Sequence, residues 1–285
     1  MVPEDAGRDR LARLRPFVPV LRIAGYVGSL AIVAVVAVEA GDDLDPSDLD
    51  LWPLPPALAL IAVWWVLLGS GWALLVAGRV RRIDIGSWCR TQALRYLPGG
   101  LWAPASRVVI VRGRMIDKLA TVAAETVIAL CAALALGGAA LAATGRPAWL
   151  AAVPALALPT LGSRFLASRT RVAPERVVPA TALYVGAFAA YAVAAVLVQG
   201  AVSGFDDWLE VAGAALVAWG VGLVVVIAPG GVGVREAAYV GLLAGSSLSD
   251  GDLAAAAVTL RVLTIFAEVG VLLVAARPVP GPAPG

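Results

Sequence analysis

Two short stretches decide the fold of this chain: Leu97-Pro98-Gly99-Gly100-Leu101-Trp102 and Ala228-Pro229-Gly230-Gly231-Val232-Gly233. Each Pro-Gly-Gly interrupts an apolar run, and an arginine follows shortly after it, Arg107 in the first copy and Arg235 in the second. Irregular backbone is tolerated at membrane depth only where protein or a wet cavity satisfies its N–H and C=O groups. Two such breaks in corresponding positions predict the binding site of a transporter-like membrane protein. Ordinary turns at the membrane surface are the alternative interpretation.

The composition excludes an average soluble domain. Hydrophobic residues make up 60% of the 285 residues and charged residues 15%, whereas soluble chains have about 45–50% apolar and about 25% charged residues. The arginines are scattered between apolar runs, so no basic face for nucleic acid accumulates. The chain has no histidine, and Cys89 and Cys131 lie far apart. We therefore expect no metal site, no cofactor and no histidine-dependent catalysis.

Six apolar segments have about the length of 20 residues that a helix needs to cross a bilayer. A seventh, Pro147–Leu161, is shorter and carries Pro154 and Pro159. We predict an all-α polytopic membrane protein with these seven spanning helices and two re-entrant Pro-Gly-Gly broken segments. Residues 1–20 form a basic N-terminal arm, residues 21–276 a single transmembrane domain, and residues 277–285 a Pro/Gly tail that cannot fold alone. The predicted spans are Leu21–Glu39, Pro56–Gly78, Leu119–Ala143, Pro147–Leu161, Pro179–Val202, Trp208–Ala228 and Leu253–Ala276.

The loops alternate between basic and acidic. The first loop, Gly41–Asp50, holds five aspartates and no basic residue, whereas the next is rich in arginine. The positive-inside rule then places the N-terminus in the cytoplasm of a multi-pass protein of the plasma membrane. We expect Ile83–Met115 to dip in from the cytoplasmic side, and parity puts the second break near that same side. Val234–Gly245 is short for a crossing, which leaves the side of the C-terminus open.

Several charges lie inside the apolar spans. Arg261 and Glu268 are seven residues apart, close to two helical turns, and share one face with Thr264. A charge at mid-bilayer costs about 2.5–3.5 kcal/mol on insertion scales, so these side chains should face the protein interior with a partner. Glu125 and the pair Arg235-Glu236 are further examples. Ion pairs that only fix helix packing are the alternative to a functional role.

The breaks and charges together predict one anion site. Backbone N–H groups freed by glycine, beside a half-helix N-terminus and arginines, favour an anion such as a phosphate. We expect both breaks to face one polar cavity, with Arg261 and at least one of Glu125 and Glu268 in its wall. Those two glutamates should hold the arginines of the site when it is empty: Arg235 and Arg261, with Arg107 or Arg95 at the cytoplasmic mouth. The predicted binding residues are Arg95, Arg107, Arg235, Arg261, Gly99, Gly100, Gly230, Gly231 and Trp102, with Glu125, Glu236 and Glu268 as charge partners.

The same segments resemble a known family. Ile227–Ala237, followed by Ala257–Leu263 and Glu268, resembles the C-terminal signature of the lysylphosphatidylglycerol synthase transmembrane domain family, which are flippase-like membrane proteins. Arg95–Trp102 is similar to the first characteristic segment of that family. Glu125-Thr126 resembles its acidic motif, although many relatives carry a basic residue after the acid. The resemblance extends from about residue 20 to residue 276.

This resemblance implies a flippase-like protein that translocates an anionic lipid or a lipid-linked sugar between leaflets. The expected partner is a membrane lipid with a phosphate head group. The residues after Arg277 are too few for a further domain, so we expect no synthase or acyltransferase activity. Two alternatives remain open: a membrane scaffold or partner subunit for a lipid-modifying glycosyltransferase, and a membrane-embedded lipid transferase. The lipid, the direction and energy source of its movement, and the oligomeric state are left undetermined by the sequence.

The predicted topology can be tested by cysteine labelling. In a background without Cys89 and Cys131, we expect Arg82→Cys and Arg114→Cys to react with an impermeant maleimide only from the cytoplasmic side. Both positions flank the first break, which should be protected between them. Labelling of either position from outside would mean that the segment spans the membrane and that every later loop changes side.

Overall fold

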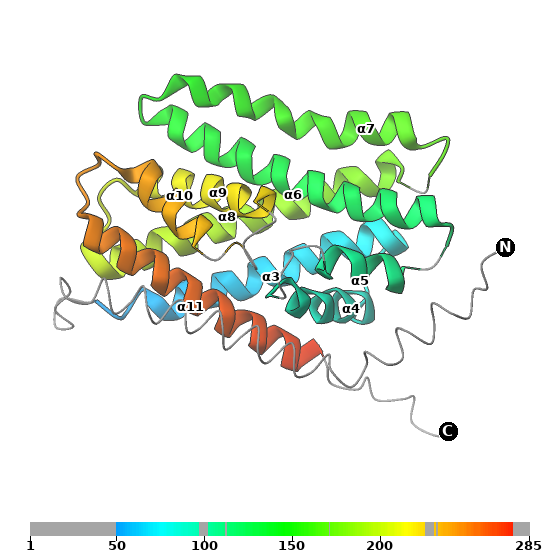
Figure 1. Ribbon diagram of the computed structural model, residues 1–285, viewed down its shortest axis with the longest axis horizontal. Coiled ribbons are helices and arrows are strands. Elements are labelled where there is room, and N and C mark those ends of the chain that lie inside the picture. The colour runs from blue at the N-terminus through cyan, green and yellow to red at the C-terminus, as the bar shows by residue number, and fades with distance from the viewer. Residues whose placement is uncertain are drawn as a thin grey trace.

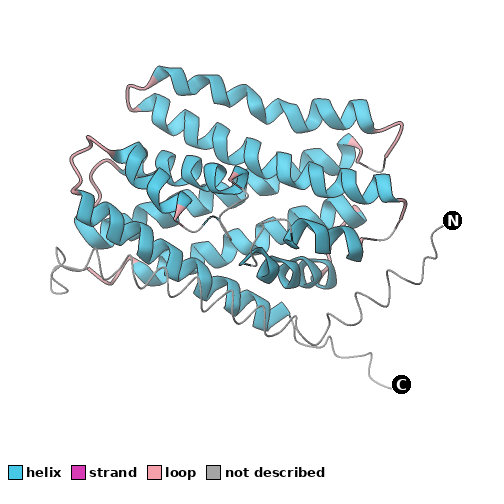
Figure 2. Ribbon diagram, viewed as in Figure 1, coloured by secondary structure: helices cyan, strands magenta, loops and turns pink. Residues whose placement is uncertain are grey.

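The computed structural model describes residues 50–96, 102–111, 113–170, 172–225, 231 and 233–275. The predicted first span, Leu21–Glu39, the N-terminal arm and the C-terminal tail lie outside these residues. The described residues form helices joined by short loops, without a strand (Figure 2). This agrees with the predicted all-α fold.

Five helical segments are long and apolar enough to cross a membrane, and five of the seven predicted segments form them. Four are single α-helices that lie roughly along a common direction in Figure 1. The fifth, Pro147–Leu166, joins a 3-10 helix to an α-helix and packs along the outside of α6. The segments are α3 (Leu54–Ala77), α6 (Met115–Ala143), η4 (Pro147–Ala157) with α7 (Leu158–Leu166), α8 (Pro174–Ser203) and α11 (Asp250–Ala275).

Short helices flank both breaks. The first break lies between η3 and α5, and the second between α9 and α10. Gly231 and Gly233 at the second break have φ angles of 71° and 80°, a region that glycine adopts at little cost. These short elements are α4 (Arg82–Gln92), η3 (Ala93–Tyr96), α5 (Trp102–Ile110), α9 (Trp208–Val224) and α10 (Val234–Leu243).

Small residues allow the helices to approach closely. A Cβ atom on Gly71 of α3 would lie 2.7 Å from Cδ2 of Tyr184 on α8, so the ring occupies the space of a side chain. A Cβ on Gly137 of α6 would lie 3.0 Å from the carbonyl oxygen of Gly213 on α9. Close backbone contact of this kind is how helices associate where apolar burial gives little driving force, as in lipid.

Aromatic side chains fill the centre of the bundle. The Trp64 ring of α3 lies 4.9 Å from the Trp65 ring and 4.9 Å from the Tyr191 ring. Phe188 and Trp219 complete the cluster, with ring centroids 4.6 Å apart. Trp64 packs against α8 and α9 in this cluster, whereas the Trp65 ring lies 5.4 Å from the Trp88 ring of α4. Both are buried, and neither faces the outside of the bundle.

Hydrogen bonds between loops define one end of the bundle. The N–H of Asp50, before α3, donates to the carbonyl of Ala201 near the end of α8 (2.9 Å). The N–H of Ser247, after α10, donates to the carboxylate of Asp207, before α9 (3.2 Å). Arg146, after α6, donates to the carbonyl of Leu242 near the end of α10 (2.8 Å). The beginning of α9 and the end of α10 therefore lie at the same end of the bundle.

The opposite end carries the arginine-rich loops. Arg176 of α8 donates to the carbonyl of Val76 at the end of α3 (3.2 Å). Arg114, before α6, donates to the carbonyl of Arg169 after α7 (2.9 Å). The segment α4–η3–α5 connects the end of α3 to the start of α6 and so enters and leaves at this arginine-rich end.

The two broken segments therefore enter the bundle from opposite ends. The sequence predicts a crossing at Trp208–Ala228 and a second break on the same side as the first. In the structure α9 ends at Val224 after 17 residues, and α10 packs against it and returns. The glycines of the break permit this turn, because Gly231 and Gly233 adopt positive φ angles at little cost. α11 then runs the length of the bundle and ends at the arginine-rich end (Figure 1).

This arrangement makes a prediction about the loops around α9 and α10. In membranes, Ser247→Cys and Asp206→Cys should both react with an impermeant maleimide on intact cells, because they lie at the end opposite to Arg82. Arg82→Cys, which should react only after lysis, is the control. Labelling of Asp206→Cys from outside together with Ser247→Cys only after lysis would contradict the hairpin.

Candidate functional site

A cavity of about 350 Å³ lies inside the bundle, between the two breaks. Its wall contains residues that flank both interrupted segments, as the repeated pattern predicts. Gly99, Gly100 and Gly230 lie outside the described residues. The flanking residues in the wall are Arg95, Ala103, Pro104 and Arg107 at the first break and Val225, Gly231 and Arg235 at the second.

Arg107 of α5 forms a buried ion pair with Glu125 of α6. The indole N–H of Trp88 donates to the other oxygen of the same carboxylate (2.6 Å). With its amide oriented to satisfy the neighbouring donors, Gln92 accepts from Arg107 Nη2 at 3.0 Å. Hydrogen bonds from both sides hold the carboxylate in place, and Glu125 is paired with Arg107 rather than with Arg235.

Arg95 of η3 forms the second buried ion pair, with Glu268 of α11 (2.7 Å). Its guanidinium also lies 4.7 Å from the centre of the Trp65 ring, within range of a cation–π interaction. The pair links the segment before the first break to the last helix, which follows the second break. Glu268 thus holds an arginine of the first break in the described structure.

Arg235 of α10 is held differently. Its side chain lies between Gly222 of α9 and Gly231, where an added Cβ would come within 2.6 Å and 2.8 Å of Arg235 Nε, respectively. Its guanidinium lies 5.2 Å from the centre of the Trp219 ring. Nε is buried without a hydrogen-bond partner, and no carboxylate of the described residues lies within ion-pair distance. Arg235 is therefore a cation stabilised by an aromatic face at the cavity wall.

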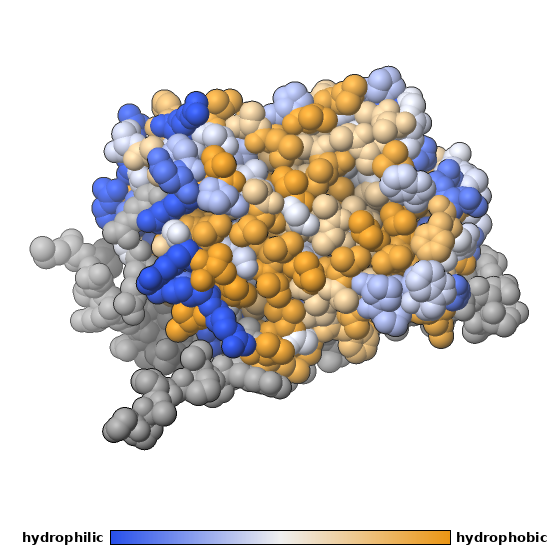
Figure 3. Space-filling model, turned by 180° about the vertical axis from the view of Figure 1, so that it is seen from behind, coloured by the Kyte–Doolittle hydropathy of each residue, from blue (hydrophilic) through white to orange (hydrophobic). Residues whose placement is uncertain are grey.

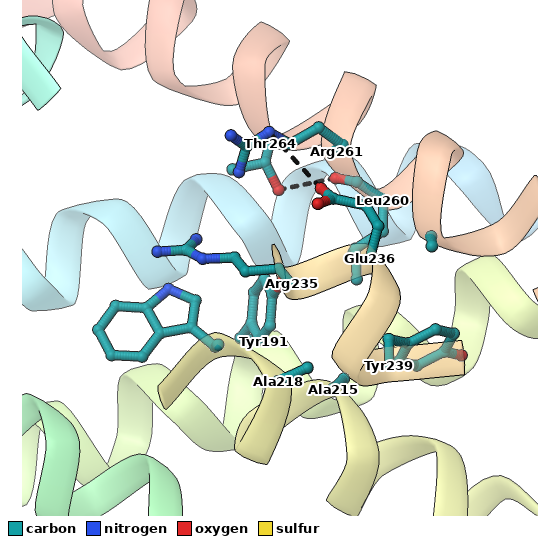
Figure 4. A pocket seen from close by; sticks show the side chains of 11 residues that line it. Tyr191, Ala215, Ala218, Arg235, Glu236, Tyr239, Leu260, Arg261 and Thr264 are labelled. Atoms are coloured by element: carbon teal, nitrogen blue, oxygen red, sulfur yellow. Dashed lines mark hydrogen bonds and ion pairs between the residues drawn. The ribbon is translucent and has the colours of Figure 1, made fainter. Parts of the chain in front are cut away.

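A second, smaller pocket of about 30 Å³ adjoins the cavity, and Arg235 and Trp219 line both. Figure 4 shows Arg261 and Glu236 facing each other across it, with an N–O distance of 3.9 Å. This distance suits an ion pair but is too long for a hydrogen bond. The hydroxyl of Thr264 donates to the carbonyl of Leu260 of its own helix (2.7 Å) and not to either charge.

The predicted face of α11 is confirmed in part. Arg261, Thr264 and Glu268 are all buried, as their spacing predicts. Arg261 lines the small pocket, however, and not the large cavity. Trp102 stands at the start of α5 with 52% of its surface exposed and is not among the residues that line either space.

Sequence reasoning missed much of the cavity wall. Trp88 and Gln92 precede Arg95 by seven and three residues, so all three share one side of the helical segment before the first break. That spacing is a signal that would have found them. Trp219 and Gly222 are three residues apart on α9 and face Arg235 in the same way. For Trp64 and Trp65, inside a uniformly apolar helix, the sequence offers no such signal.

No family model, no curated protein and no solved structure matches this chain. The interpretation of the site therefore depends on its geometry. That geometry is a cavity between apolar helices, with three arginines and one glutamate in its described wall.

The Arg107–Glu125 pair predicts a specific pattern of stability. Glu125→Leu leaves Arg107 buried without its counter-charge, a change that costs about 3–5 kcal/mol in soluble proteins. The double variant Arg107→Met with Glu125→Leu removes both charges and should unfold at a clearly higher temperature than the single variant. Thermal unfolding of the detergent-solubilised protein measures this.

Glu210→Leu is the matched control, because its pair with Arg146 is more exposed and should contribute little. A single variant at Glu125 as unstable as the double variant would contradict the pairing.

Proposed function

We propose that this chain is a multi-pass membrane protein that moves lipids with an anionic head group between the two leaflets of the plasma membrane. The apolar character of its surface supports the membrane environment. Figure 3 shows a broad hydrophobic face between hydrophilic margins at the two ends of the bundle. The five long helices run between those ends. By the positive-inside rule, the arginine-rich end is the cytoplasmic one.

The observation that carries the proposal is an excess of buried donors in the cavity wall. Nε of Arg235 and Nε1 of Trp65 and Trp219 are buried and have no hydrogen-bond acceptor among the described residues. Buried donors without partners are rare in native proteins and call for an explanation. A ligand made of acceptors, and carrying negative charge for Arg235, would satisfy them. Phosphate oxygens have both properties.

The position of the cavity between the two breaks supports movement of a head group rather than simple binding. One broken segment bounds the cavity from each end of the bundle, and both contribute arginines to the wall. A lipid head group can lie between them while its acyl chains remain in the surrounding lipid. Rocking of one hairpin against the other would expose the same cavity first to one leaflet and then to the other, as in transporters with broken helices.

The proposal is tested with purified protein in phosphatidylcholine vesicles that contain phosphatidylglycerol with a fluorescent acyl chain. We expect wild-type protein to expose probe from the inner leaflet to an external quencher faster than protein-free vesicles do. Arg235→Gln should slow this movement roughly tenfold, because a charge-assisted hydrogen bond is lost.

Arg164→Gln is the matched control, since it removes one arginine charge at an exposed position of α7. It should move the probe at the wild-type rate. Wild-type movement no faster than that of protein-free vesicles, or full movement by Arg235→Gln, would contradict the proposal.

A further inference from the structure

The charges that line the small pocket do not cancel. Arg235, Glu236 and Arg261 meet there, two cations and one anion (Figure 4). Glu236 pairs with Arg261 across the pocket, although they belong to different helices, α10 and α11. Arg235, next to Glu236 in the chain, points instead toward Trp219 and the large cavity. The described group therefore carries one net positive charge, located on Arg235.

The other arginines of the cavity wall add no further uncompensated positive charge. Arg107 is neutralised by Glu125, and Arg95 by Glu268. Both pairs are buried, so separating either would leave a charge without its partner. The described residues thus offer an incoming anion one unpaired cation, and three further cations already matched by carboxylates.

The cavity is also small. Ligand sites span about 300–1,000 Å³, and this one is near the lower limit at about 350 Å³. Its size suits a single lipid head group. A second phosphate would need a second unpaired cation.

We infer that Glu236 sets the charge selectivity of the cavity: by neutralising Arg261 it restricts the site to a head group with one net negative charge, a phosphate diester. Phosphate monoesters and diphosphates carry additional charge that the site does not balance. This inference rests on the proposed function and goes beyond it by naming the substrate class and the residue that selects it. A phospholipid and a sugar linked through a single phosphate share this chemistry.

A series of four proteins varies the charge of the pocket by design. The wild type carries one net positive charge, Glu236→Gln two, Arg261→Gln none, and the double variant Glu236→Gln with Arg261→Gln one again. Two fluorescent probes are compared in phosphatidylcholine vesicles: phosphatidylglycerol, a diester, and phosphatidate, a monoester. The measurement is made at pH 8, above the second pKa of a phosphate monoester at about 6.

We expect the wild type to move phosphatidylglycerol faster than phosphatidate. Glu236→Gln should shift the ratio of the two rates toward phosphatidate by about tenfold, because one unit of charge is added close to the phosphate. The double variant should restore the wild-type preference, and Arg261→Gln should slow both probes. Glu210→Gln, which removes a glutamate charge from an ion pair outside the cavity, is the matched control and should leave the ratio unchanged.

The outcomes distinguish a failure of the charge selectivity from a failure of the proposed lipid transport. A ratio that Glu236→Gln leaves unchanged while both probes still move would overturn the charge selectivity and leave the lipid transport standing. A wild-type preference for phosphatidate would do the same. Absence of movement of either probe in wild-type vesicles would overturn the transport proposal, and the inference with it. If Glu236→Gln does not fold, the double variant and Arg261→Gln still decide the question.

Discussion

The pairing of buried charge across the broken segments is the constraint on which the rest of this structure depends. Burial of an isolated guanidinium or carboxylate in apolar surroundings is costly, so each must lie where another element supplies a group of opposite charge. Arg107 and Glu125 join α5 to α6, and Arg95 and Glu268 join η3 to α11. These contacts fix where the segments around the first break lie, and hence where a cavity can exist between them and α9–α10.

Each break is followed by a short helix and then a long one, and the ion pair between them has its charges placed the opposite way round in the two cases. In the first unit, the short helix α5 carries the arginine and the long helix α6 the glutamate. In the second, the short helix α10 carries Glu236 and the long helix α11 carries Arg261. The pairing of a short helix with the following long one is kept, while the charges are exchanged. Arg235 is the charge that this exchange leaves over, and it lies on the boundary between the two pockets.

Much of this architecture follows from local pattern. Length and hydropathy predict the five long helices, and the buried face of α11 follows from the spacing of Arg261, Thr264 and Glu268. The direction of α9 does not follow, because an apolar run of 17 residues that turns back resembles one that crosses. Which glutamate meets which arginine is also a tertiary result: Glu125 and Arg107 are near in sequence, but Glu268 and Arg95 meet only after the whole chain has folded. The place of Trp64 and Trp65 in the cavity wall could not be predicted, because tryptophans in a uniformly apolar helix show no periodicity against their neighbours.

Gly222 and Gly231 hold the side chain of Arg235 in a fixed orientation, which the charges of the site alone would not do. A long arginine side chain in an apolar protein normally bends toward the nearest water and retains many rotamers. The side chain of Arg235 instead runs through the narrow space that the two missing Cβ atoms leave, and its guanidinium rests on a tryptophan. Its conformational entropy has been given up during folding, so an arriving anion meets a cation that is already oriented and need not be ordered by binding.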